Sequence, residues 1–181
     1  MTLAGKKKAE NVIEYILYLW QMQDLVRAAG FDLGAVRHFL GGGNDELNID
    51  EELEWFAGII TAMKSHGVDR KGNLPEIDEL LIELNYLHHT LIDLIRDAKY
   101  IEVWTTARPL LDEFLQRSGN PSMNPIEAML TSLYGLLVLR LRGQEPTAAT
   151  LTAIDAFKVV LVKLGGHYHD MRRGSNHFSM N

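Results

Sequence analysis

Titratable side chains gather near the C-terminal end of the sequence, in the stretch GGHYHDMRRGSNHF. His167, His169 and Asp170 are residue types that bind zinc and similar cations, so they are weak candidates for metal ligands, and His177 follows them. The other interpretation is a hydrated polar tail without a site, which is the usual state of short histidine-bearing chain ends. We favour the polar tail and predict neither a metal centre nor a cofactor here.

Two patterns in the same tail resemble known catalytic signatures but are incomplete. His169 and Asp170 resemble the metal-binding pair of the HD phosphohydrolases, which also use another histidine and a later aspartate, and no aspartate follows Asp170. Arg172 and His177 match the R-x(4–6)-H pattern of certain helical ribonucleases. Those enzymes need the pattern on a rigid helix, whereas Gly174 lies inside it here. The tail therefore supplies no predicted catalytic residue.

A second group of titratable residues lies in LNYLHHTLIDL. On a helix His89 and Asp93 are i, i+4 neighbours, and Asn85 precedes His89 by the same step, so we interpret this row as a polar outer face. His88 instead points toward the core. A buried histidine is more often bonded to a carboxylate or carbonyl than catalytic, although His88 is also a candidate pocket residue.

The stretch EYILYLWQMQDLVR raises a third question, because a carboxylate lies on an apolar face. At about 100° per residue, Asp24 falls between Leu17 and Trp20, where an unpaired charge would cost roughly several kcal/mol. Arg27, three residues later, is the nearest partner, and a bound ligand is the alternative. A candidate pocket or buried polar cluster follows from these positions: Trp20, Gln21, Asp24, Arg27 and His88.

Several known catalytic patterns are absent from the sequence. No histidine has a glutamate three residues before it, as di-iron carboxylate bundles require, and the zinc-hydrolase, nucleophile-elbow, phosphate-loop and dinucleotide motifs do not occur. There is no cysteine, which excludes disulfides, thiolate catalysis and cysteine metal ligands. These absences favour a function that is not enzymatic.

Charge and hydropathy restrict the partners and the compartment. The 24 acidic and 18 basic residues give a net charge of -6, which repels nucleic acid and anionic lipid surfaces. The most apolar segment, 129–141, is shorter than the roughly 20 residues that span a bilayer. The basic and then apolar N-terminus contains Glu10 and Glu14, so we interpret it as mature protein. We expect a cytoplasmic protein.

Capping residues and glycines divide the chain into about six to seven helices. The sequence predicts an all-α, single-domain bundle over 1–166, with antiparallel-type helices, and a flexible polar tail over 167–181. Pro109 is expected to kink or split the fifth helix. Asn48, Asn73 and Asn124 are each followed three residues later by a glutamate, as in a capping box. The expected helices are about 4–29, 33–40, 49–66, 74–97, 99–117, 125–142 and 147–164.

Apolar periodicity indicates which helices lie at the centre. The helix over 125–142 is apolar nearly all round, so we expect it to be central. On the helix over 74–97 one face is continuously apolar, while Ile82 and Tyr86 point the other way. In the first helix Tyr15 and Leu19 likewise lie off the main apolar face. These four side chains suggest a face that is covered by a partner.

Three stretches resemble a Bacteroidetes-associated family of uncharacterised proteins, domain of unknown function 4924. They are IEYILYLWQMQDLVRA, LNYLHHTLIDL and LYGLLVLRLRGQEPTAATLTAIDAF, and the resemblance spans about Lys6 to Leu164. It implies an all-helical fold and a cytoplasmic bacterial protein, and it implies no catalytic residues. The sequence HYHDMRRGSNHF stands where the resemblance implies a lysine-rich and acidic tail.

Two functions follow as hypotheses. The first is a non-enzymatic interaction or scaffold protein, most simply a homodimer, that buries an apolar helix face against itself or an unknown protein partner. The alternative is a small-molecule or metal-binding protein, possibly a hydrolase, with a pocket around Asp24 and His88. The two differ in whether those two side chains share a cavity.

Overall fold

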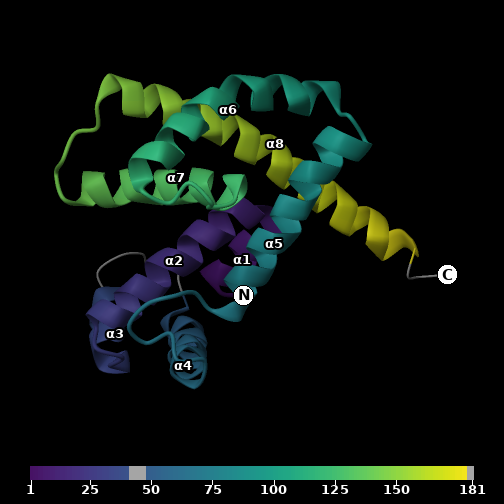
Figure 1. The fold of residues 1–181 in the computed structure, drawn as a ribbon. Coiled ribbons are helices and arrows are strands. Elements are labelled where there is room, and N and C mark those ends of the chain that lie inside the picture. Colours follow the sequence, from purple (N-terminus) through teal and green to yellow (C-terminus); the bar gives the residue numbers. More distant parts are fainter. Residues whose placement is uncertain (41–47, 179–181) are drawn as a thin grey trace. The chain divides into compact units, whose positions relative to one another are not determined.

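The computed structural model describes residues 1–40 and 48–178, with side chains described for 1–40 and 48–174. The predicted all-α fold is confirmed, and the described residues contain no strand (Figure 1). The chain forms two compact units, Met1–Leu80 and Leu81–Asn181. The helices are α1 (Leu3–Glu10), α2 (Val12–Ala28), α3 (Leu33–Leu40), α4 (Ile49–Ser65), α5 (Pro75–His89), the π-helical turn η1 (Thr90–Leu94), α6 (Ala98–Ser118), α7 (Pro125–Leu141) and α8 (Ala148–Phe178).

The predicted first helix is two helices, because the chain turns at Asn11. This residue has an extended backbone, with φ -155° and ψ 102°, and its side chain accepts hydrogen bonds from the amides of Ile13 and Glu14. Asparagine competes with the helical backbone through such local bonds, which makes it a good N-cap and a poor interior residue. As a result α1 ends at Glu10 and packs on α2.

The first unit buries the apolar face of α2 together with residues from α4. Ile16, Leu19, Phe56 and Met63 are among its fully buried side chains. Tyr15 and Leu19 are buried too, so the prediction that they point outward is wrong. Helix α2 contacts both α1 and α4.

Local capping signals in this unit are partly confirmed. The Asn48 side chain accepts from the Glu51 amide at the start of α4, as predicted. The glycines 41–43 that were expected to end α3 lie outside the described residues.

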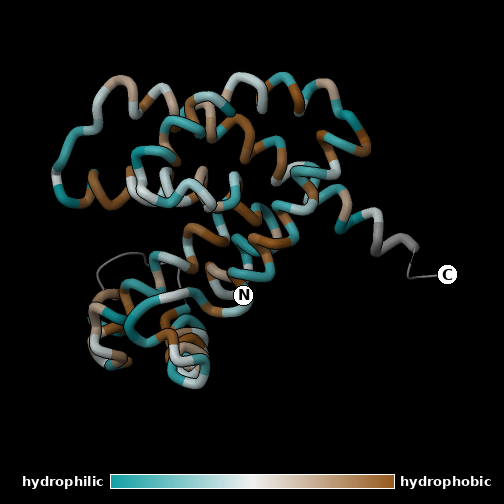
Figure 2. The backbone as a smooth tube through the Cα atoms, viewed as in Figure 1, coloured by the Kyte–Doolittle hydropathy of each residue, from teal (hydrophilic) through white to brown (hydrophobic). Residues whose placement is uncertain are grey.

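Hydrophobic residues recur along each helix with hydrophilic residues between them, which gives the helices buried and solvent-facing sides (Figure 2).

The predicted helix over 74–97 changes its winding before it ends. After His89 the chain makes the π-turn η1, in which the Ile95 amide donates to the Thr90 carbonyl five residues back, at 2.9 Å. Arg96 then takes φ 56°, in the left-handed region, and Asp97 caps α6 by accepting from the Tyr100 amide at 2.8 Å. The helical segment therefore ends at Leu94, three residues earlier than expected.

In the second unit α6 packs along α8, and α7 packs on both. Helix α6 runs through Pro109 without being split, and α7 begins at the predicted Asn124 cap. The first half of α7 is central, with Ile126, Met129 and Leu130 fully buried. Its last turns are only partly buried, so the prediction that the whole helix is central is wrong.

Helix α8 does not end at Gly165 and Gly166 but continues to Phe178, so the predicted helix end at Leu164 is wrong. Each glycine weakens a helix by roughly 0.5–1 kcal/mol relative to alanine. Burial of Leu164 and Tyr168 on either side of the pair offsets that cost. No helix among the described residues is long and apolar enough to cross a membrane.

Candidate functional site

Polar side chains of α2 hold the loop over 66–74 within the first unit. Trp20 Nε1 donates to Asn73 Oδ1 at 3.0 Å, and Arg27 Nη2 donates to the Val68 and Gly72 carbonyls at 3.0 and 2.6 Å. The buried Gln23, which the sequence did not single out, accepts from the amide of the loop's last residue at 3.0 Å. Backbone groups of a loop need such partners when they leave water. This part of the predicted cluster positions a loop.

The Asp24 carboxylate binds Arg27 Nη1 at 3.0 Å, as predicted. Its side chain is 54% exposed, however, so the expectation that it lies within an apolar environment is wrong. The buried residues of this turn of α2 are Gln23 and Val26, and Asp24 lies on its exposed side. Gln21 is only half-buried. An exposed carboxylate at this edge needs no ligand to neutralise it.

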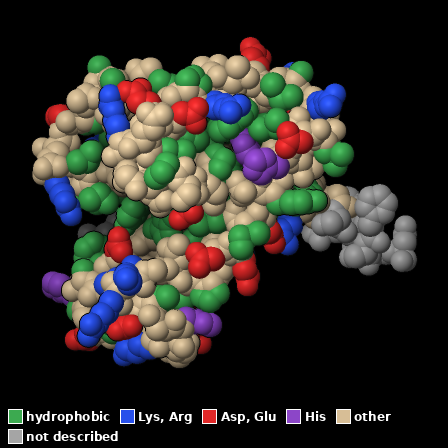
Figure 3. Space-filling view, viewed as in Figure 1, with side chains coloured by type: hydrophobic (Ala, Val, Ile, Leu, Met, Phe, Trp, Pro, Cys, Tyr) green, Lys and Arg blue, Asp and Glu red, His purple; other side chains and the backbone are tan. Residues whose placement is uncertain are grey.

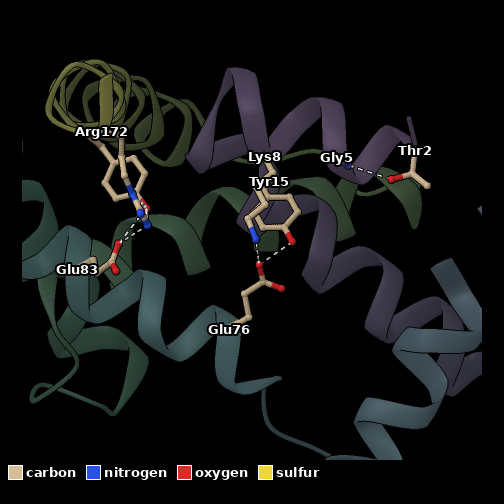
Figure 4. Close-up of polar contacts among 8 residues, drawn as sticks. Thr2, Gly5, Lys8, Tyr15, Glu76, Glu83 and Arg172 are labelled. Atoms are coloured by element: carbon tan, nitrogen blue, oxygen red, sulfur yellow. Dashed lines mark hydrogen bonds and ion pairs between the residues drawn. The ribbon is translucent and has the colours of Figure 1, made fainter. Parts of the chain in front are cut away.

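Glu76, expected to form a capping pair with Asn73, instead joins the N-terminal helices to the start of α5. It accepts from Tyr15 Oη at 2.9 Å and from Lys8 Nζ at 2.6 Å (Figure 4). Burial, and next the charge of Glu76, raise the pKa of the Tyr15 hydroxyl. The Asn73 amide donates to Asp78 at 3.0 Å. The capping-pair prediction is therefore wrong, because Glu76 binds residues of α1 and α2, and Asn73 binds Trp20 and Asp78.

His88 lies in the core of the second unit, as predicted. It is 1% exposed, and its Nδ1 is 2.7 Å from the hydroxyl of Tyr100, which is fully buried. The indole ring of Trp104 meets the imidazole edge-on, with centroids 4.5 Å apart. The partner of His88 is thus a phenol from α6, where a carboxylate or carbonyl was expected. We call these three residues the His88 cluster.

Burial lowers the pKa of His88 to about 4. The neighbouring His89 lowers that pKa further, whereas Asp93 opposes the shift. The imidazole is therefore neutral at neutral pH, with one ring nitrogen protonated. Burial also raises the pKa of Tyr100, so its hydroxyl stays protonated at neutral pH.

Two ion pairs flank the His88 cluster. His89 Nδ1 lies 3.6 Å from Asp93 Oδ2 on the exposed side of the helix, as the i, i+4 spacing predicted. From α8, His167 Nε2 lies 3.8 Å from Asp97 Oδ2, and the His167 ring meets the Tyr100 ring edge-on at 6.2 Å. Each pair is ionic only when its histidine is protonated.

The tail residues lie on the last turns of α8. Arg172 and Tyr168 both bind Glu83, at 3.3 and 2.9 Å, and the guanidinium lies over the Tyr168 ring (Figure 4). Burial lowers the pKa of His169. The side chain of His177 lies outside the described residues. Within 1–40 and 48–174, no three histidine and acidic side chains gather in a way that could hold a metal ion.

The predicted site residues thus divide between two environments. Trp20, Asp24 and Arg27 come together at one loop of the first unit. His88 contacts aromatic residues of the second unit that the sequence did not single out. The sequence spacing alone did not predict the contact between His88 and Tyr100. The π-turn between these two residues changes the helical register.

Comparison with known protein families identifies a match. The family model described as domain of unknown function (DUF4924) matches residues 1–175. The chain belongs to this family. No curated protein and no solved structure matches it. The DUF4924 match reaches beyond Leu164, so most of the stretch that seemed to depart from the family lies within it.

Proposed function

We propose that this DUF4924 chain is a non-enzymatic interaction or scaffold protein that pairs with a second copy of itself. The observation that supports this proposal is an uncovered apolar surface on α5 and η1. A cytoplasmic, bacterial protein fits the family resemblance and the cysteine-free sequence. Other protein partners could use the same surface, and the outcome of the test below separates them from self-association.

The surface, which we call the α5–η1 apolar face, consists of Ile82, Tyr86, Leu94 and Ile95. Their exposed fractions are 69%, 74%, 78% and 60%, respectively. Isolated exposed apolar residues are normal on a protein surface, but four large ones between residues 82 and 95 are not. Hydrophobic side chains are also visible between charged ones on the face drawn in Figure 3.

The π-turn brings Leu94 closer to the side of the segment on which Ile82 lies. In a regular α-helix, Leu94 would be rotated by about 120° from Ile82, at roughly 100° per residue. The wider π-turn rotates less per residue and so reduces this divergence. A two-fold axis can pair such a face with its own copy, because each residue then meets the same apolar surface.

Substitution within the face tests the proposal. We expect wild type to be a dimer in multi-angle light scattering and Tyr86→Glu to weaken dimerisation by about tenfold or more, since a buried unpaired carboxylate opposes association. Val162→Glu is the matched control. Val162 is 70% exposed on α8, so this variant adds the same charge at an equally exposed apolar position of the same unit.

The outcomes separate the possibilities. A dimer that only Tyr86→Glu disrupts supports self-association through this face. A monomeric wild type contradicts the homodimer. Equal dissociation of both variants would mean that the α5–η1 apolar face is not the interface.

The alternative, a small-molecule or metal-binding protein with a pocket around Asp24 and His88, has less support. The described partners of Asp24 and Arg27 are each other and a loop, and those of His88 are aromatic. A thermal-shift screen of metals and metabolites tests this function directly. A ligand-dependent increase in Tm that Asp24→Ala and His88→Phe both lose would favour it over the interaction protein.

A further inference from the structure

The segment between α5 and α6 combines two unusual backbone features. The π-turn η1 replaces the last turns of the expected helix, and Arg96 then takes φ 56°, which residues other than glycine rarely adopt. The Asp97 amide closes the segment by donating to the Leu91 carbonyl six residues back, at 2.9 Å. Such features cost conformational energy and persist only where the surroundings impose them.

Tyr100 ties both ends of this segment together. Its amide donates to the Asp97 side chain at 2.8 Å, and its hydroxyl contacts His88 at 2.7 Å. The chain from His88 to Tyr100 is therefore a short closed loop, with the buried Leu91 at its inner side. Among the described residues, the His88–Tyr100 contact is the polar contact that joins the two ends of this loop.

That link depends on the protonation state of the imidazole. A neutral imidazole has one donor and one acceptor nitrogen, so it can exchange a hydrogen bond with the phenol in either direction. A charged imidazolium has two donors and no acceptor. The phenol would then have to accept, and its own proton would need another acceptor in a site with no exposed surface.

The charged and titratable groups around His88 do not offset this effect. On the same segment, His89 adds positive charge when protonated, and Asp93 is an exposed carboxylate that pairs with His89. From α6 come the neutral Tyr100 and Trp104. From α8, His167 faces Tyr100 and pairs with Asp97. No carboxylate among these contacts the His88 ring directly, so a charge there would be poorly compensated.

We propose that the His88–Tyr100 contact is an acid-sensitive latch that holds η1 and the Arg96 turn against α6. With the latch closed, His88 is neutral and the strained segment stays in place. Protonation of His88 opens the latch and releases residues 90–97, while the rest of the fold persists. This inference does not depend on the proposed dimer, because it concerns contacts within one unit of one chain.

The size of the effect follows from linkage. The closed state holds the pKa of His88 at about 4, whereas an open, hydrated histidine has its ordinary pKa of 6.5. The open state therefore binds more protons between these values, and opening becomes more favourable as the pH falls from about 6.5 toward 4. Relative to neutral pH, we expect the opening equilibrium constant to increase about tenfold at pH 5.5 and about thirtyfold at pH 5.

Hydrogen exchange on the full chain tests the latch. Protection factors for the amides of residues 90–97, corrected for intrinsic exchange, are compared at about pH 7.5 and about pH 5. Amides of α4 in the first unit serve as an internal reference for global unfolding. The double variant His88→Phe with Tyr100→Phe replaces both polar groups by apolar ones of similar shape, and His89→Gln removes the neighbouring exposed histidine as a matched control.

The latch predicts that wild type and His89→Gln lose protection in residues 90–97 by roughly thirtyfold at the lower pH while α4 does not. The double variant should show no such pH dependence. Equal loss in α4 would indicate global acid unfolding, and unchanged protection in wild type would mean that no latch opens. Either result overturns the proposal. Both can be measured on the wild-type chain alone if the double variant fails to fold.

Discussion

The Arg27 guanidinium binds two loop carbonyls and one carboxylate, and these contacts differ in their contribution to stability. The Val68 and Gly72 carbonyls depend on Arg27 for a donor, whereas the Asp24 carboxylate is largely hydrated. The Val68 contact is part-buried, and removing the donor of a part-buried acceptor costs more than removing an exposed ion pair. Arg27, rather than Asp24, is therefore the residue on which this part of the first unit depends.

Two variants of similar shape separate these contributions. Arg27→Met keeps the apolar stem but removes every donor, and we expect it to lower the free energy of unfolding by about 1–3 kcal/mol. Asp24→Asn should lower it by less than about 1 kcal/mol, because the pair is exposed. Urea unfolding of both variants checks this order. If Asp24→Asn lowered the free energy of unfolding more than Arg27→Met does, Asp24 would have the more important role.

At the residue scale, the sequence predicted contacts between side chains that are one or two helical turns apart. The Asp24–Arg27 and His89–Asp93 pairs were predictable because helix geometry fixes their spacing. The His88–Tyr100 contact was not, because it depends on a π-turn and a left-handed Arg96 between the two residues. Burial of Gln23 was also missed, since its partner is a loop amide 51 residues away.

At the scale of elements, helix starts were more predictable than helix ends. Asn48 and Asn124 cap α4 and α7 through local side-chain bonds that the sequence pattern specifies. Continuation through Gly165 and Gly166 depends instead on what α8 packs against, because Leu164 and Tyr168 are buried. Local propensity favours an end at the glycine pair, and tertiary packing overrides it.

The continuity of α8 can be tested at Gly166. A Cβ at this exposed helical position meets no atom within 4 Å, so Gly166→Ala should stabilise the protein by about 0.5–1 kcal/mol and raise Tm. Gly119→Ala is the contrasting control. Gly119 has φ 72° at the end of α6, where alanine is strained, so Tm should fall. Thermal unfolding followed by circular dichroism measures both.

If Gly166→Ala lowered Tm as Gly119→Ala does, α8 would end at the glycine pair, and the placement of Tyr168 and Arg172 on the same helix would be wrong. The Glu83 contacts of those two residues depend on that continuity. The test therefore bears on how the C-terminal turns of α8 are attached to α5 within the second unit.

At the scale of the whole molecule, the fold class and the family were predictable, whereas the function was not. Helical periodicity extends over most of the sequence, and the resemblance to DUF4924 is confirmed over residues 1–175. The proposed function depends on which surface stays uncovered. Of the four side chains expected to face outward, Ile82 and Tyr86 do so, but Tyr15 and Leu19 are buried.

The native mass of the wild-type chain tests self-association most directly. Sedimentation velocity from about 1 to about 100 µM covers the range in which a specific dimer of modest affinity forms. We predict a species of twice the chain mass of 20.5 kDa that becomes dominant as the concentration rises. A single species of one chain mass at every concentration would contradict the proposed homodimer.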